Sequence, residues 1–167
     1  MGFTPVKEYE YFKKVNTASP RKFEKIDMDI QSNKDKLHDY VKNTKIFGKL
    51  SMQENADLVM FYCISDFKNC VYYSKSLDVM AVAKINNQQL YVLDVFSKDE
   101  INLELIVDSL ADEKIKSVVL GFTPKDCIHY DVRLIDEILK DEVLFIQNGK
   151  TKLFEEHQIM FPLLSHA

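Results

Sequence analysis

The fold is decided by the stretch VMAVAKINNQQLYVLDVF, residues 79–96. It holds two apolar runs of strand length, residues 79–85 and 90–96, on either side of Asn86-Asn87-Gln88. Asn and Gln clusters between two such runs are typical of a hairpin turn. The stretch therefore predicts two antiparallel strands at the centre of a sheet.

The next segment extends this hairpin into a mixed sheet. Asn102 can cap a helix in which Leu103, Ile106, Val107 and Leu110 recur at helical spacing, and residues 115–122 then form another apolar strand. A strand, helix and strand of this length allow a crossover that sets the two strands parallel. We therefore expect an α/β (α+β) fold, a mixed central sheet with flanking helices.

Upstream of the hairpin, we expect one edge strand within residues 3–11 and a loop at residues 16–20, where Pro20 disfavours a helix. This loop divides the chain into residues 1–20, an N-terminal strand and linker, and a domain of residues 21–167. A helix capped by Ser32 or Asn33 should carry Leu37 and Tyr40 and end at Gly48. The apolar run 58–64 has strand length, and we expect it to be a strand with Cys63 buried in it.

Composition excludes several classes of protein. The 167 residues are 46% apolar with a net charge of −4, and acidic and basic residues are interleaved, so the basic patch of a nucleic-acid binder is missing. No apolar run approaches the ~20 residues that span a bilayer. The three cysteines and four histidines show no ligand spacing, so we expect no metal site and a cytoplasmic protein. The four glycines form no phosphate-binding loop.

Both the order of elements and three short strings resemble the GNAT superfamily of N-acetyltransferases. The strings are Met-Phe-Tyr-Cys at 60–63, Val-Leu-Gly-Phe-Thr-Pro at 119–124 and Phe-Pro-Leu-Leu-Ser-His-Ala at 161–167. The segment 1–11 looks like the closing strand of a GNAT domain, which implies a preceding lobe. The resemblance implies a GNAT-like sheet, acetyl-CoA as cofactor, a small-molecule or peptide amine as acceptor, and an N-terminal lobe or a homo-oligomer as partner.

The resemblance also suggests catalytic residues. Tyr130 follows the last long strand, where GNAT enzymes often use a tyrosine as general acid, and the alternative is a packing tyrosine. His166 or the Ala167 carboxylate would be a proton acceptor, as in GNAT proteins whose chain end enters the active site, and the alternative is a tail that covers the sheet. Asp94 is either a catalytic carboxylate or a residue at the sheet edge that accepts backbone hydrogen bonds.

The segment 97–102 departs from the GNAT pattern. A working GNAT enzyme has a glycine-rich loop there, whose N–H groups hold the CoA pyrophosphate. This chain has no glycine in that segment and carries Asp99 and Glu100 instead. The sequence therefore leaves two alternative functions open. One is a GNAT N-acetyltransferase or its C-terminal domain, and the other is a non-catalytic binding module on a degenerate GNAT scaffold.

Overall fold

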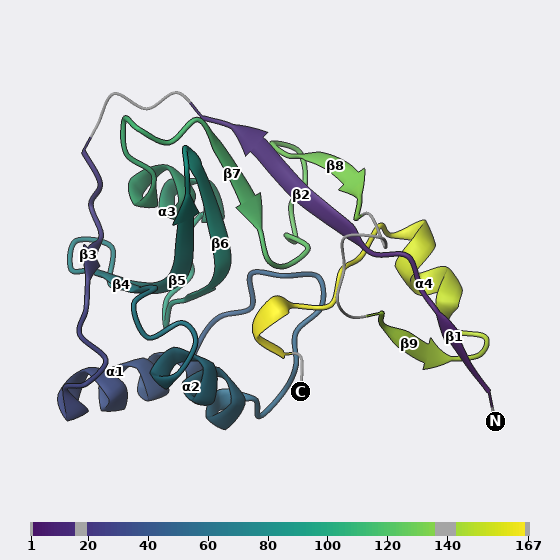
Figure 1. Ribbon diagram of the computed structural model, residues 1–167, viewed down its shortest axis with the longest axis horizontal. Helices are drawn as coiled ribbons and strands as arrows, with labels where there is room; N and C mark the ends of the chain where they lie inside the picture. The colour runs from purple at the N-terminus through teal and green to yellow at the C-terminus, as the bar shows by residue number, and fades with distance from the viewer. Residues whose placement is uncertain (1, 16–19, 136–142, 166–167) are drawn as a thin grey trace.

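The central feature of the chain is a seven-stranded mixed sheet, which confirms the expected α/β class (Figure 1). The computed structural model describes residues 2–15, 20–135 and 143–165. The strands follow one another across the sheet in this order: β3 (Glu24–Lys25), β4 (Val71–Ser74), β5 (Val79–Asn86), β6 (Gln89–Phe96), β7 (Ser117–Leu120), β2 (Tyr9–Lys14) and β8 (Asp131–Leu134).

The hairpin and the crossover are both confirmed. β5 and β6 pair antiparallel, and Asn87 takes φ 55° in the turn, a left-handed conformation that Asn tolerates. Helix α3 (Leu103–Leu110) then carries the chain to β7, which pairs parallel to β6. The Asn102 side chain caps α3 as predicted, because its oxygen accepts a hydrogen bond from the Glu104 N–H at 2.7 Å.

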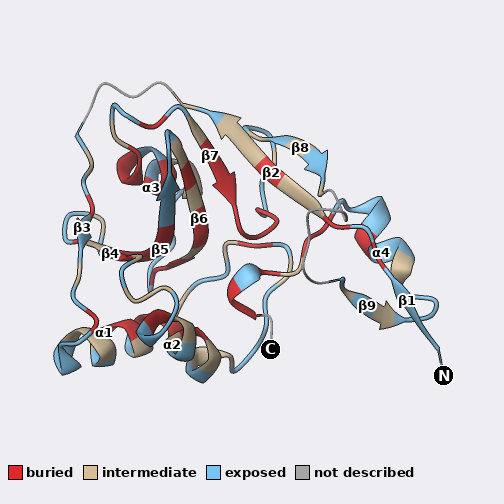
Figure 2. Ribbon diagram, viewed as in Figure 1, coloured by how far each residue is buried: buried red, intermediate tan, exposed pale blue. Residues whose placement is uncertain are grey.

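Helices cover both faces of the sheet, so its central strands are buried on both sides (Figure 2). Ile106 and Leu110 of α3 pack on one face. The other face is covered by α1 (Gln31–Lys42), α2 (Ala56–Ile64) and a short 3-10 helix, η2 (Leu163–Ser165). Four residues of the central strands β6 and β7 are at most 6% exposed: Leu93, Val95, Val119 and Leu120.

Residues 58–64 form most of helix α2, so the predicted strand is wrong. The whole run is apolar, and such a run carries no periodicity that separates a buried strand from a buried helix. Packing selects the helix: Val59 and Cys63, four residues apart, are fully buried against the sheet, whereas Phe61 and Ile64 are exposed.

The N-terminal segment is not an edge strand either. It forms β1 (Phe3–Pro5) and β2, and β2 lies between β7 and β8 with hydrogen bonds to both. Tyr11 of β2 is therefore buried in the core. The division at residue 20 stays a prediction.

Helix α1 ends at Lys42 and not at Gly48, because residues 44–50 are hydrogen-bonded to the ends of two strands. The described part of the C-terminal segment docks on the body, since Leu164 is fully buried. A separate two-stranded ribbon pairs β1 with β9 (Phe145–Gln147) and packs near α4 (Thr151–Glu156). None of the described helices is both long and apolar enough to cross a membrane.

Candidate functional site

A β-bulge in β6 places Asp94 in the wall of a cavity. The register shifts between Val82 and Ala83 of β5, so β6 contains one extra residue. Val92 packs on the α3 face and Leu93 on the α1–α2 face, and the same alternation resumes at Val95. Asp94 lies between these two pairs, so the bulge keeps the apolar side chains in their layers and directs a carboxylate out of them.

The approach of β7 to this bulge requires a glycine. A Cβ at Gly121 would lie 2.8 Å from the Leu93 carbonyl oxygen and 3.0 Å from Leu163 Cδ1. The Gly121 N–H donates to the Val92 carbonyl at 2.7 Å, and its own carbonyl accepts from the Leu163 N–H at 2.9 Å. Gly121 thus joins the bulge to the C-terminal 3-10 helix.

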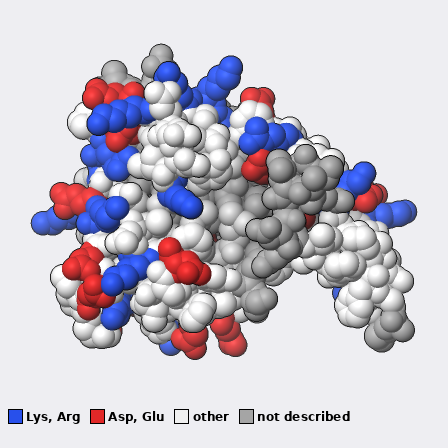
Figure 3. All heavy atoms as spheres, viewed as in Figure 1, with Lys and Arg blue, Asp and Glu red and all other residues white. Residues whose placement is uncertain are grey.

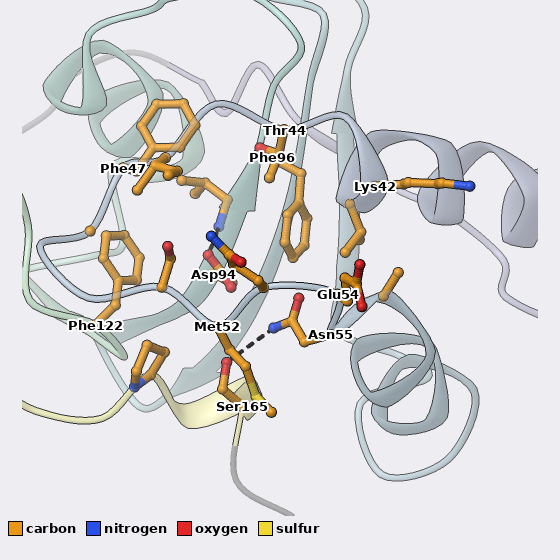
Figure 4. Close-up of a pocket in the computed structure, with 18 of the residues that line it drawn as sticks. Lys42, Thr44, Phe47, Met52, Glu54, Asn55, Asp94, Phe96, Phe122 and Ser165 are labelled. Atoms are coloured by element: carbon orange, nitrogen blue, oxygen red, sulfur yellow. Dashed lines mark hydrogen bonds between the residues drawn. The ribbon is translucent and has the colours of Figure 1, made fainter.

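The cavity measures about 660 Å³ and opens beside Asp94 (Figure 4). Three aromatic side chains, Phe47, Phe96 and Phe122, surround it, and its floor is made by β6 and η2. The Asn55 amide donates to the Ser165 hydroxyl at 3.1 Å, which connects the start of α2 to η2 across the cavity mouth.

One wall is a strap, residues 44–50, held at both ends. At one end the Lys45 N–H donates to the Ser97 carbonyl at 2.7 Å, and the Ser97 N–H donates to the Thr44 hydroxyl at 3.0 Å. At the other end the Lys49 N–H donates to the Thr123 carbonyl at 2.8 Å. The strap therefore crosses from the end of β6 to the segment after β7.

The environment of Asp94 destabilises its ionised form. Desolvation in the cavity wall raises the pKa of Asp94 to about 7, although the Val95 N–H donates to its carboxylate at 2.8 Å. No described lysine, arginine or histidine forms an ion pair with Asp94. When this carboxylate ionises, at and above about neutral pH, no described basic side chain balances its charge.

Cys63 lies near Asp94 on the buried side of α2 and does not add a nucleophile. Burial raises the pKa of its thiol to about 12, and the Asp94 carboxylate contributes in the same direction. The thiol is therefore protonated and packs as a small apolar side chain, as the sequence predicted.

The loop after β6 does not fit the pyrophosphate of acetyl-CoA. Two N–H groups in this part of the chain already have acceptors: the Asp99 N–H donates to the Ser97 hydroxyl at 3.2 Å, and the Glu104 N–H at the start of α3 donates to the Asn102 side chain at 2.7 Å. A smaller hollow of about 230 Å³ at the start of α3 is lined by Glu100, Glu104 and Asp126, with Lys125 and His129 opposite. Three carboxylates there would repel a diphosphate.

Of the catalytic residues that the resemblance suggests, Tyr130 is the one that the structure describes, and it lies away from the Asp94 cavity. Tyr130 lies against Lys13 of β2, whose Nζ is 5.7 Å from the ring centroid, and it is not part of the cavity lining. Its hydroxyl is buried without a hydrogen bond from any described residue, and burial followed by the nearby Glu104 carboxylate raises its pKa. His166 and Ala167 lie outside the described residues. Their catalytic roles, like that of Tyr130, stay predictions.

Asp94 was singled out in the sequence because it interrupts an apolar strand. The other polar contributors, Thr44, Asn55 and Ser165, were missed. Thr44 lies in the strap, Asn55 directly precedes α2 and Ser165 ends η2, so no periodicity of the sequence links them and only the fold brings them together.

Comparisons with known proteins give only distant structural likeness. No protein family matches the chain, and no curated protein is similar to it. One solved structure with a similar arrangement is a GCN5-related N-acetyltransferase from Sphaerobacter thermophilus, with 10% sequence identity and a TM-score of 0.39. The match covers 95% of this chain and 50% of that one, so this chain spans about half the length of that protein.

Proposed function

We propose that this chain is a ligand-binding domain related to the GNAT N-acetyltransferases, and that it holds an amine-bearing small molecule in the Asp94 cavity without binding acetyl-CoA itself. The observation that carries the proposal is the position of Asp94 in the wall of a cavity lined by aromatic side chains, where its carboxylate forms no ion pair with any described residue. The resemblance implies the transfer of an acetyl group from acetyl-CoA to an amine. This reaction would then belong to a longer protein of which this domain is a part.

The ligand class follows from charge and shape. An ionised carboxylate in a low-dielectric wall is stabilised by a cation that brings both charge and hydrogen-bond donors, and a protonated amine brings both. The faces of Phe47, Phe96 and Phe122 can pack against the apolar part of such a ligand, and aromatic faces also attract cations. A volume of about 660 Å³ suits a molecule of metabolite size.

Acetyl transfer by this chain is the second candidate. It is supported by the pKa of Asp94, because a carboxylate with a pKa of about 7 is suited to accept a proton from an ammonium group. The loop at residues 97–102 argues against it, since it contains no glycine and its charge is negative. The geometry thus supports binding better than transfer.

Amine binding can be tested by a thermal-shift screen of primary amines against the matching alcohols, followed by calorimetry on the best ligand. We expect amines to raise the melting temperature and alcohols not to. Asp94→Asn should weaken the amine about ten- to a hundredfold, the value of a hydrogen-bonded charge. Asp57→Asn, a matched change on a fully exposed side chain at the cavity rim, should leave affinity within about twofold. If no amine binds, or if the Asp94 variant binds equally well, the proposal is wrong.

Acetyl-CoA binding can be tested separately by calorimetric titration at near-physiological salt. We expect a dissociation constant above about 100 μM, because like charge opposes the diphosphate and residues 97–102 contain no glycine-rich loop to hold it. A low-micromolar constant, or acetylation of an amine by the isolated chain, would instead support the second candidate.

A further inference from the structure

The ribbon of β1 and β9 has two apolar faces, and only one of them is covered. Pro5 pairs with Phe145 in the register, so Phe3, Pro5 and Phe145 share one face. Ile146 lies on the opposite face and packs against a small core that includes Phe154. On the first face, here called the outer ribbon face, Phe3 is 69% and Phe145 57% exposed. Two adjacent phenylalanines in water leave a large apolar area unburied.

The ribbon is also free of charge. Segments 2–6 and 143–149 contain no Asp, Glu, Lys or Arg, although such residues make up 29% of the chain. In Figure 3 the projecting lower right part of the molecule, where the ribbon lies in Figure 1, is largely white, whereas blue and red side chains cover the body. A partner can therefore approach the ribbon without desolvating charged groups.

The outer edge of β9 offers backbone groups for pairing. The Val6 N–H donates to the Leu144 carbonyl and the Asn148 N–H to the Gly2 carbonyl, both at 3.0 Å. In an antiparallel pair this alternation turns the N–H groups of Phe145 and Gln147 away from β1. No described strand pairs with that edge. It also lacks the lysine or proline that commonly protects a free edge.

We propose that a second copy of this chain covers the ribbon, with the two β9 strands pairing antiparallel about a twofold axis to make a four-stranded sheet. Two identical strands that run antiparallel satisfy such an axis, so each copy gives and receives the same contacts. The net charge of −4 makes two copies repel over most of their surface, and the uncharged ribbon is where they can meet. β1 is less suited to this role, because Pro5 has no N–H to donate. The proposal is independent of the Asp94 cavity.

Sedimentation of the untagged chain at concentrations from about 1 to 100 μM tests whether this dimer forms. An interface made by one ribbon from each copy is small, so we expect a dissociation constant in the micromolar range. We expect a mass that rises from 19.5 kDa toward twice that value. Phe145→Lys, and separately Phe3→Lys, should leave a monomer with an unchanged circular dichroism spectrum. Ile128→Lys, on a side chain 80% exposed outside the ribbon, is the matched control and should still dimerise. A wild-type monomer throughout, a dimer that survives both ribbon variants, or equal loss in the Ile128 control would each overturn the proposal.

Discussion

Leu120→Ala is expected to lower the free energy of unfolding by about 2–5 kcal/mol. Leu120 is 1% exposed and is the last residue of β7, opposite Val92 on one side and Tyr11 on the other. Its side chain packs in the core between the sheet and α3. Removing three carbons there loses burial and leaves a cavity, because the paired strands on both sides cannot close in on it.

Urea denaturation gives the measurement, as a lower midpoint with an unchanged slope. Leu105→Ala is the matched control: the same substitution on α3, at a side chain 45% exposed, should cost less than about 1 kcal/mol. A loss below about 1 kcal/mol for Leu120→Ala would mean that β7 is not a central strand.

The centre of the sheet could be predicted because local signals and tertiary packing agree there. The runs around Asn86–Gln88 have strand length and a turn between them, and Asn102 is both a good cap and the observed one. The run 58–64 lacked such agreement. Every residue in this run is apolar, so its sequence fits a buried strand and a buried helix equally well. Which of the two forms depends on how the run packs against the sheet beneath it.

The candidate site was harder to predict, since it depends on pairing. The bulge that presents Asp94 exists only because β5 has one residue fewer than β6 at that point, and because Gly121 lets β7 come close. No feature of the sequence of residues 90–96 indicates that the strand contains a bulge. The strap is likewise fixed by distant partners, Ser97 and Thr123, which lie at the ends of two other strands.

Asp94→Asn is expected to stabilise the unliganded protein above neutral pH. The pKa of Asp94 is raised from 3.8 to about 7 in the folded chain, so between pH 4 and 7 the folded state holds a proton that the unfolded state has released. Stability of the wild type therefore falls as pH rises through this window and is constant above it. One pKa unit corresponds to about 1.4 kcal/mol, so a shift of about three units gives a total on the order of 4 kcal/mol.

Asn removes this cost, because it is neutral at every pH and its side-chain oxygen can still accept the Val95 N–H. Urea unfolding at pH 4.5 should give similar stability for the wild type and Asp94→Asn. At pH 8 Asp94→Asn should be the more stable of the two. Asp57→Asn, on an exposed carboxylate, should show no such difference. If Asp94→Asn is destabilising at pH 8, the carboxylate has a partner inside the protein. If it is stabilising, the wild type retains an unpaired charge at a cost to its own fold, and the binding of a cation in the cavity would offset that cost.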